Sequence, residues 1–572
     1  MSRRRMYSTE EAYAFLASSS GSDSGEELLY LPSSSSSSTD SDEEPPRHRP
    51  RPGPSTSPST NIEPGPSAIS EWAPASNFIP NLPEFVATAG IRVDTVGLKE
   101  ADFFQLFFSE ELINLIVEET NRYAEQFIAA NPQAYHARPY QWTPTNALEL
   151  KNFFALLFNM GIVKKPTIRS YWSNDMLYHT PLYRSVMPRN RFEALLKFLH
   201  YANNENCPPP SDPNFDRIYK IRPLVNYLNQ KLSEVYTPEK EIAVDESLVH
   251  FKGRLHFRQY LPNKRARYGV KLYKLCESAT GYTHKFRVYE GKDSKIEPPE
   301  CPPVLKTTGK IVWDLVHPLL DQGYNIYLDN FYTSVPLLQC LFAKGTVACG
   351  TIRRNQRDLP KIFVRQKLKK GESKAVCKDN MMLVKYQDKR DVLVLTTLHP
   401  DRSTPVQVRG TTESAPKPVC IQDYNKFMGG VDLSDQALQP YTALRKTKTW
   451  YKKLALHLFQ ITMYNSFVVY KRAGNTCTYL QFQENVIKDF LFGDPEGEES
   501  RATGSENRIV PGQHFPAVVP RRESGSRQQK RCRVCSKRGI RKCTIYHCET
   551  CPHKPGLCIE DCFKIYHTTY DI

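Results

Sequence analysis

Three separate stretches of the chain carry acidic residues where a divalent metal site could form. Asp245 interrupts the apolar segment EIAVDESLVHFKG, and Asp329 ends a second apolar segment, GYNIYLDNFYTS. Asp432 and Asp435 follow a Gly-Gly pair in DYNKFMGGVDLSDQ, three residues apart, as on one face of a helix start. Three carboxylates brought together, with a fourth close by, would hold two divalent ions for in-line phosphoryl transfer. For any single acid, the simpler alternative is an arginine partner or a place at the end of a strand.

The segments around these acids predict the elements that would position them. Residues 241–253 have the pattern of a short, largely buried strand, and residues 268–278 and 283–291 alternate as half-buried strands do. Residues 310–323 are amphipathic and predict a helix before the strand that ends at Asp329. Strand, strand, strand, helix, strand is the order of an RNase H-like fold, so we predict an α/β catalytic domain.

Four motifs in this order resemble the catalytic core of the piggyBac superfamily of transposases: VDESLVHFKGR, YLPNKRARYGVK, YLDNFYTS and YNKFMGGVDLSDQ. The resemblance runs from about Phe85 to the C-terminus and implies an RNase H-like fold. It implies that Asp245, Asp329 and Asp432 are catalytic and hold Mg²⁺ or Mn²⁺, and that Asp435 is functional as well. It further implies a cut-and-paste DNA transposase that excises its element through hairpin-ended DNA and inserts it at TTAA sites.

The helical, β-rich and polar segments give a domain prediction in which two of the domains are each built from two parts of the chain. Residues 109–128, 143–162 and 445–472 have helical patterns, and family resemblance assigns this helical region to dimerisation and DNA binding. The predicted divisions are a disordered, acidic, Ser-rich tail (1–84), the helical dimerisation and DNA-binding domain (85–240 and 441–494), the RNase H-like catalytic domain (241–352 and 414–440), a β-rich insertion domain (353–413), a linker (495–527) and a cysteine-rich zinc-binding domain (528–572).

Basic residues interleaved with aromatic ones favour contact with DNA beside the acids. Such residues would neutralise phosphates and stack on unpaired bases. The simpler alternative is that this run of charged residues only forms a solvent-exposed surface. Trp450 is either a core anchor or, by resemblance to the family's R-K-T-x-x-W motif, a residue next to the cleaved DNA end. The predicted DNA contacts are Arg254, Arg258, Lys264, Arg265, Lys271, Arg445, Lys446 and Trp450, with Arg267 and Lys274 in the same basic segment.

Soft metal ligands are concentrated near the C-terminus and predict two tetrahedral zinc ions per chain. His547 and His553 compete with Cys543 for one of the eight places. A protein-binding cross-brace finger is the alternative, but twelve Lys/Arg against four Asp/Glu in residues 521–567 favour DNA binding. The predicted ligands are Cys532, Cys535, Cys543, Cys548, Cys551, Cys558, Cys562 and His567.

Charge and composition set the wider limits on partners and location. The 572 residues carry a formal net charge of +16, which favours a polyanionic partner, and no apolar run is long enough to predict a membrane span. We expect double-stranded DNA as the partner, a homodimer or higher assembly on DNA, no membrane association and a nuclear location. Two other functions remain open: a domesticated derivative that binds DNA without cutting it, and a zinc-finger adaptor whose acids are incidental.

Overall fold

The computed structural model describes residues 71–131, 142–262, 267–407, 414–443, 447–493 and 514–568, apart from residues 77, 293, 515, 523, 524, 550 and 552. It divides into two compact units, Met1–Leu491 and Phe492–Ile572. Among the described helices, none is both long enough and apolar enough to cross a bilayer.

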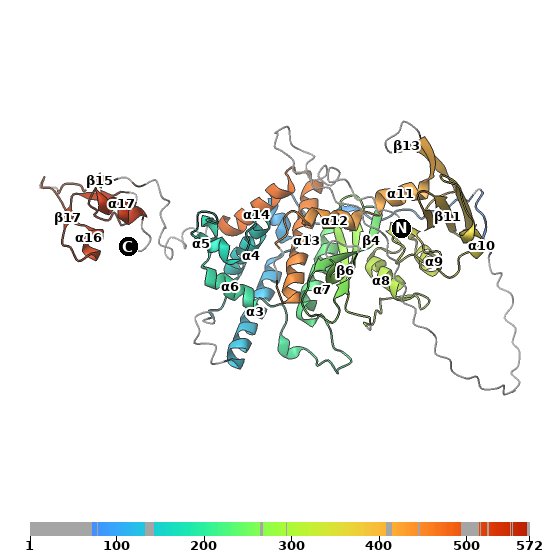
Figure 1. Ribbon diagram of the computed structural model, residues 1–572, viewed down its shortest axis with the longest axis horizontal. Coiled ribbons are helices and arrows are strands. Elements are labelled where there is room, and N and C mark those ends of the chain that lie inside the picture. Colours follow the sequence, from blue (N-terminus) through green and yellow to red (C-terminus); the bar gives the residue numbers. More distant parts are fainter. Residues whose placement is uncertain are drawn as a thin grey trace. The chain divides into compact units, whose positions relative to one another are not determined.

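A mixed β-sheet forms the centre of the first unit (Figure 1). Strands β4, β6 and β7 pair antiparallel, and β8 and β9 continue the sheet parallel to β4, giving the spatial order β7-β6-β4-β8-β9. This is the RNase H-like order, so the predicted fold is confirmed, and helices α8 (Thr307–Val316) and α9 (Val335–Ala343) make the two crossovers. The five strands are β4 (Glu241–His250), β6 (Tyr268–Glu277), β7 (Thr283–Val288), β8 (Asn325–Leu328) and β9 (Val347–Thr351).

Side-chain alternation along β4 gives the sheet two different faces. Ile242 and Val244 pack with the apolar residues of α8 and α9. Ala243 faces the other way, where it packs with residues of α11 (Val419–Phe427). Asp245 belongs to this second face, which is also covered by α12 (Gly430–Leu438).

The β-rich segment between the second and third acids extends the central sheet. Strand β12 pairs antiparallel with β9, and β11, β10 and β1 follow in order. β1 lies in residues 71–84, which we had predicted as tail; Ala75 is 1% exposed and the Trp72 indole donates to the carbonyl of Asp358 at 3.0 Å. Ordered structure is therefore present before residue 84, the predicted end of the tail, because a few apolar side chains of residues 71–84 pack at the edge of the sheet. The remaining elements here are β1 (Ala73–Pro74), β5 (Gln259–Tyr260), α10 (Lys361–Arg365), β10 (Ser373–Lys378), β11 (Met381–Gln387), β12 (Asp391–Thr396), and the hairpin of β13 (Ser403–Gln407) and β14 (Ser414–Pro418).

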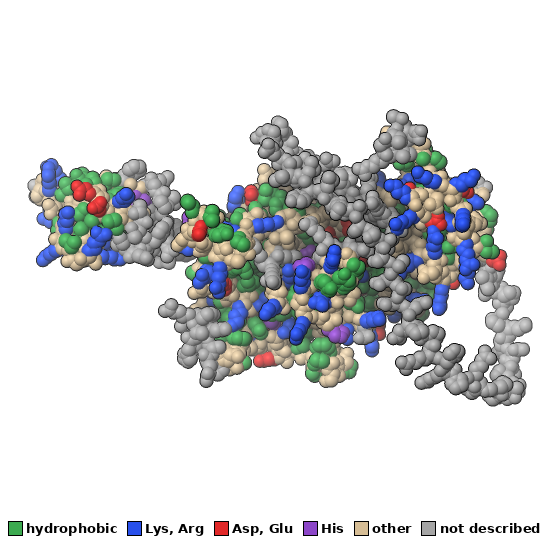
Figure 2. Space-filling model, viewed as in Figure 1, with side chains coloured by type: hydrophobic (Ala, Val, Ile, Leu, Met, Phe, Trp, Pro, Cys, Tyr) green, Lys and Arg blue, Asp and Glu red, His purple; other side chains and the backbone are tan. Residues whose placement is uncertain are grey.

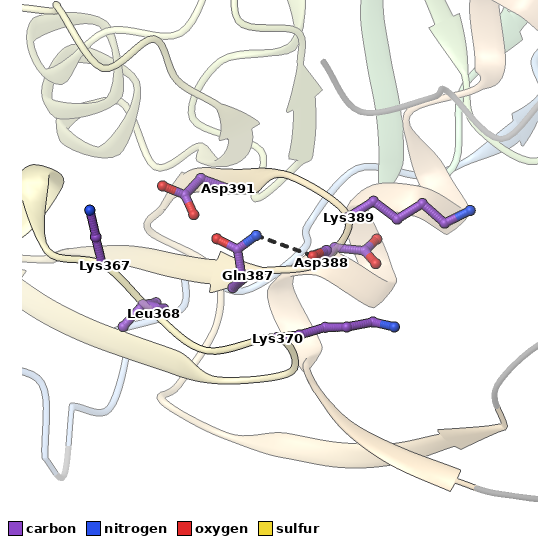
Figure 3. A pocket seen from close by; sticks show the side chains of 7 residues that line it. All are labelled: Lys367, Leu368, Lys370, Gln387, Asp388, Lys389 and Asp391. Carbon is purple, nitrogen blue, oxygen red and sulfur yellow. Dashed lines mark hydrogen bonds between the residues drawn. The ribbon is translucent and has the colours of Figure 1, made fainter.

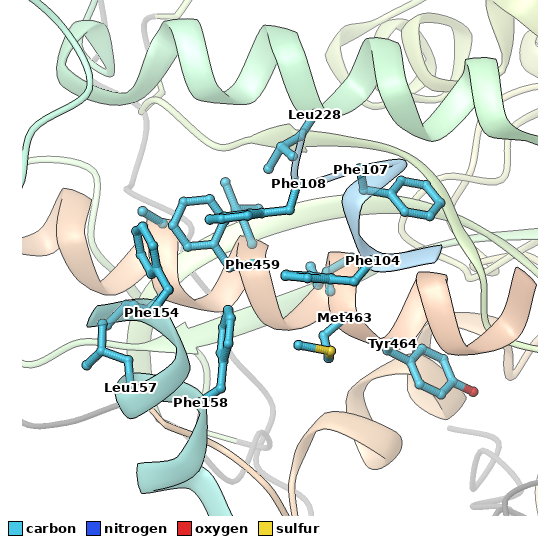
Figure 4. Packing of buried hydrophobic residues seen from close by; sticks show 14 of the residues in the cluster. Phe104, Phe107, Phe108, Phe154, Leu157, Phe158, Leu228, Phe459, Met463 and Tyr464 are labelled. Atoms are coloured by element: carbon cyan, nitrogen blue, oxygen red, sulfur yellow. The ribbon is translucent and has the colours of Figure 1, made fainter. Parts of the chain in front are cut away.

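Helices from before and after the sheet segment share one core (Figure 4). The long helix α13 (Trp450–Arg472) is buried on nearly all sides, and Asn465, one of its buried polar side chains, accepts the Thr283 N–H at 3.0 Å and donates to the Thr283 carbonyl at 2.8 Å. Phe459 of α13 meets Phe108 edge to face at 5.0 Å and Phe154 at 5.2 Å. The other elements are β2 (Gly90–Ile91), α2 (Glu100–Gln105), α3 (Glu110–Ala130), α4 (Ala147–Ile162), η3 (Arg169–Trp172), α5 (Pro181–Val186), α6 (Arg189–Phe198), η4 (Asn204–Asn206), η5 (Tyr219–Ile221), α7 (Arg222–Val235), β3 (Tyr236–Thr237), η6 (His317–Leu319) and α14 (Tyr479–Phe492).

The second unit is small and built from short elements around cysteine side chains. Two antiparallel strand pairs and two helices are present among its described residues. They are β15 (Pro516–Val518) with β18 (Tyr546–Cys548), β16 (Lys530–Arg531) with β17 (Cys543–Thr544), α16 (Arg533–Lys537) and α17 (Asp561–Thr568).

Candidate functional site

Asp245 lies in β4, and Asp329 directly follows β8, the strand parallel to β4. Val244 pairs with Leu328, so each acid comes one residue after a paired residue. Asp245 is 1% exposed, and its Oδ1 accepts the backbone N–H of Glu246 at 2.8 Å. The Thr351 hydroxyl, which also lies 3.4 Å from the Tyr424 hydroxyl of α11, donates to Asp329 Oδ1 at 3.4 Å. The two carboxylates therefore belong to the face covered by α11 and α12.

Helix α12 brings the other two acids to this face. Its first residue, Gly430, lies so close to the end of β6 that an added Cβ would be 2.8 Å from the Glu277 carbonyl oxygen. The Gly-Gly pair thus lets the helix start against backbone. Asp432 lies in the first turn and Asp435 one turn later, where both of its oxygens accept the Ser247 hydroxyl, at 2.7 and 2.8 Å.

The donor set of the first three acids fits Mg²⁺ or Mn²⁺. Carboxylate oxygens are the ligands that these hard ions prefer. Asp245, Asp329 and Asp432 do not form one of the groups whose ligand atoms all lie within 4.8 Å of one another; both such groups found in the described residues are in the second unit. Two ions about 3.5–4 Å apart share ligands that are more widely spaced than the ligands of a single ion. The wider spacing of the three acids therefore agrees with a two-ion site.

Four of the eight predicted DNA contacts lie among the described residues, and they differ in exposure. Arg254 and Arg258 are exposed in the loop between β4 and β5, where Arg258 also donates to the carbonyls of Lys252 (3.0 Å) and Gly253 (3.1 Å). The other four lie outside the described residues: Lys264, Arg265, Arg445 and Lys446.

Lys271 belongs to the sheet interior, so its prediction as a surface DNA contact is corrected. It is 7% exposed, and its ammonium lies 4.8 Å from the ring centre of Tyr273 and 4.6 Å from that of Phe331. Glu246 lies 3.9 Å from the same ammonium. Lys274, from the same basic segment, is also fully buried. Both residues lie on β6, whose two faces are covered, and a charge count along the sequence does not show this.

Trp450 is the first residue of α13 and is only partly buried. Its ring meets Phe257, from the loop after β4, edge to face at 5.3 Å, and Tyr451 at 5.9 Å. The indole thus packs on the helical core with one part while another part stays open to solvent.

Eight side chains in the second unit form two groups of four potential zinc ligands. The first is Cys532, Cys535, Cys558 and Cys562, and the second is His514, Cys548, Cys551 and His567. Their order along the chain is interleaved, as in a cross-brace. Seven predicted ligands are therefore brought together, whereas Cys543 is not among them.

His514 takes the place that we predicted for Cys543. Successive side chains of strand β17 point to opposite faces, so Thr544 is buried whereas Cys543 is exposed. Neither His547 nor His553 belongs to either group. His514 falls in the predicted linker among Gly and Pro residues, and no ligand spacing of the C-x2-C kind marks it.

Distances within both groups agree with tetrahedral zinc. Two thiolates bound at about 2.3 Å would lie about 3.8 Å apart; Cys535 Sγ is 3.5 Å from Cys562 Sγ and 4.0 Å from Cys558 Sγ. Cys551 Sγ is 3.4 Å from His567 Nε2 and 3.8 Å from His514 Nδ1. His567 Nδ1 lies 2.7 Å from the Phe563 carbonyl oxygen, to which it would donate, leaving Nε2 free to bind metal.

Burial and hydrogen bonds shift the pKa values of the thiols in different directions. Burial and hydrogen bonds with the Cys532 and Cys535 thiols raise the pKa of Cys558 to about 11. Burial also raises the pKa of Cys532, but hydrogen bonds from the backbone N–H groups of Cys535 and Cys558 bring it down to about 7. Zinc stabilises all four thiolates together, so the residues present fit this ion.

A pocket of about 620 Å³ lies beside the turn between β11 and β12 (Figure 3). Lysines and acids line it, and Gln387 donates to the Asp388 carbonyl at 3.2 Å. In the sheet order, β12 and β9 separate β11 from β8, so this pocket is apart from the four acids. Lys and Arg side chains also gather over this region in Figure 2.

Comparison with known proteins identifies the class to which this fold and site belong. Residues 99–467, more than half of the chain, match the family described as Transposase IS4, and residues 513–568 match a DDE_Tnp_1-like zinc finger. The second match begins just before His514 and ends just after His567. The chain therefore belongs to the family described as Transposase IS4. It is a transposase of the piggyBac superfamily.

Individual relatives agree with this placement. Human PiggyBac transposable element-derived protein 3 is 26% identical over 480 residues, which cover 80% of this chain and 74% of that protein. Human PiggyBac transposable element-derived protein 2 is 25% identical over 439 residues, covering 72% and 69%. The cryo-EM structure of a piggyBac transposase synaptic complex with hairpin DNA is 25% identical, with a TM-score of 0.63, and the match covers 82% of this chain and 98% of that one. The predicted superfamily and α/β fold are confirmed.

Proposed function

We propose that the chain is a cut-and-paste DNA transposase whose DDD-type active site consists of Asp245, Asp329 and Asp432. The observation that carries the proposal is the placement of Asp245 and Asp329 at equivalent positions of parallel strands, on the face where α12 carries Asp432. Oxygen ligands from two strands and a helix would hold two Mg²⁺ or Mn²⁺ ions. When bound, these ions would activate an attacking oxygen and stabilise the leaving oxygen of a DNA phosphodiester.

The exposure of the acids agrees with the strand-cleavage steps that this function requires. Burial of Asp245 keeps one ligand away from bulk water, while the partly exposed Asp432 leaves room for a DNA strand. Water would attack first and nick one strand at each element end. The released 3′-hydroxyl would then attack the opposite strand, forming a hairpin and releasing the flanking DNA. A second water would open the hairpin and regenerate the 3′-hydroxyl, which would finally attack a TTAA target. The similar piggyBac transposase that was solved with hairpin DNA supports the hairpin step of this proposal.

Partners and location follow from charge and the zinc unit. A net charge of +16 supports binding of double-stranded DNA, namely element ends and target, by a homodimer or larger assembly. The basic zinc unit would read the ends, and basic residues such as Arg521 and Arg522 would direct the protein to the nucleus. Within the superfamily, we place the chain beside the transposase of the piggyBat element, on the resemblance of length and motifs.

A nicking assay tests the proposal. The zinc-loaded full chain would be incubated with DNA carrying the ends of the element that encodes it, in Mg²⁺ or in Ca²⁺. We expect nicking at the ends in Mg²⁺ and binding without nicking in Ca²⁺, since Ca²⁺ accepts looser coordination geometry. Binding without nicking in both Mg²⁺ and Mn²⁺ would instead support a DNA-binding derivative that no longer cuts.

A further inference from the structure

Lys274 is a fully buried lysine on β6, directly opposite Asp245. Cross-strand partners project from the same face of a sheet, so both side chains point toward α12. The Lys274 ammonium donates to the Ser434 hydroxyl at 2.8 Å and lies 3.3 Å from Asp435 Oδ1. Both acceptors belong to α12, and Lys274 therefore ties this helix to the sheet beside the first catalytic acid.

Ser247 makes a second tie from the neighbouring strand. It lies two residues after Asp245 on the same face of β4 and is 2% exposed. Its hydroxyl lies 2.7 Å from one oxygen of Asp435 and 2.8 Å from the other. The Asp435 carboxylate is thus engaged by a hydroxyl and an ammonium that are both fixed in the sheet.

The position of Asp435 determines the position of Asp432. The two residues lie three apart on α12, which has only nine residues. Because residues three apart share a helix face, a rotation of α12 that released Asp435 would also swing Asp432 away from Asp245.

We propose that Lys274 and Ser247 are positioning residues of the active site. They hold Asp435, and through it α12, so that Asp432 faces Asp245 and Asp329. Asp435 is the anchor of this helix and not a metal ligand. The inference rests on the proposed function of the three other acids.

A single substitution at Asp435 does not separate an anchor from a ligand. Removing one partner of a buried ion pair leaves an uncompensated charge, so Asp435→Asn would disturb α12 whether or not the residue binds metal. The comparison must therefore be made in a background where the pair is already broken.

The first test uses Mn²⁺ binding, measured by calorimetry on the zinc-loaded full chain. Ser247→Ala/Lys274→Met, in which both contacts from the sheet to Asp435 are already broken, is compared with Ser247→Ala/Lys274→Met/Asp435→Asn, and Asp245→Asn shows the loss expected for a true ligand. An anchor predicts equal Mn²⁺ affinity in the double and the triple variant. A further loss of affinity in the triple variant would make Asp435 a ligand and overturn the inference.

The second test compares Ser247→Ala with Ser247→Thr in the nicking assay and in thermal melting. Threonine keeps the hydroxyl, so we expect Ser247→Thr to nick nearly as wild type does. Ser247→Ala should nick about tenfold more slowly or worse, with melting close to that of the threonine variant, because small misplacements reduce rates strongly. Equal nicking by both variants would refute a positioning role. An inactive wild-type chain would refute the proposed function itself, so the two failures are distinguishable.

Discussion

Asp245 of β4 and Asp329, which directly follows β8, each come one residue after the pair formed by Val244 and Leu328 on these parallel strands. This register brings the two acids to the same level, at the end of β8. Only the third acid then depends on a separately packed element, the helix α12. The proposed active site therefore combines one acid within the sheet, one directly after a strand and one on a helix packed against the sheet.

Substitution of the acids should separate cleavage from binding. Asp245→Asn, Asp329→Asn or Asp432→Asn should each lower nicking about 10²-fold to 10³-fold or more, because each removes several kcal/mol of metal-mediated stabilisation. Binding to element ends, measured by fluorescence anisotropy in Ca²⁺, should stay nearly unchanged. Asp388→Asn, at the β11–β12 turn, is the matched control and should nick normally. An acid whose asparagine variant nicks normally does not belong to the site.

Gly430→Ala should impair catalysis through the position of α12. Its Cβ would be 2.8 Å from the Glu277 carbonyl oxygen, so the start of the helix must shift, at about 1–3 kcal/mol. We expect a larger loss of nicking than of melting temperature. Gly309→Ala is the control, since the atoms nearest to its Cβ would be those of the Leu305 side chain, the first at 3.3 Å. Normal nicking by Gly430→Ala would show that α12 tolerates the shift.

The RNase H-like order could be predicted from the sequence because each strand has its own hydrophobic pattern, whereas the catalytic role of the acids rests on the family resemblance. The sequence did not predict the anchor of α12, since Lys274 looks like any other lysine of a basic segment until its strand is known to be covered on both faces. His514 was missed for a similar reason: its partners Cys548 and Cys551 are more than thirty residues away and only the folded unit brings them together. Local patterns reveal elements, whereas contacts between distant elements need the fold.

Zinc content distinguishes His514 from Cys543. The wild-type chain should contain two zinc ions by native mass spectrometry, and Cys543→Ser should keep both because Cys543 is exposed. His514→Ala should lose zinc from its group and weaken end binding, since metal binding supplies the folding free energy of such small units. Two retained ions in His514→Ala with loss in Cys543→Ser would reverse the assignment.

The salt dependence of DNA binding distinguishes the exposed from the buried basic residues. Arg254→Ala should weaken end binding and reduce the slope of log K against log salt by about 0.9, the value for one phosphate contact. Lys271→Met should leave that slope unchanged and lower the melting temperature, because Lys271 packs between Tyr273 and Phe331 beside Glu246. A reduced salt slope for Lys271→Met would show that Lys271 contacts a DNA phosphate after all.

Trp450→Ala should slow the steps after the first nick more than the nick itself. Hairpin formation and target joining need bases unstacked beside the acids, and an indole supplies a stacking face worth about 1–3 kcal/mol per base. Because Trp450 is only partly buried, the loss of stability should be smaller than the about 3–5 kcal/mol of a core tryptophan. Quantifying nicked and second-strand products alongside the melting temperature checks both expectations.

Two further variants make the Trp450 test decisive. Trp172 is 6% exposed and its indole donates to the Met187 carbonyl at 2.7 Å, so Trp172→Ala should lower melting and reduce every step alike. Trp450→Phe keeps an aromatic face against Phe257 and should recover much of the second-strand product. If Trp450→Ala behaves as Trp172→Ala does, with a large drop in melting temperature and uniformly low products, Trp450 is a core residue whose indole has no separate role at the DNA end.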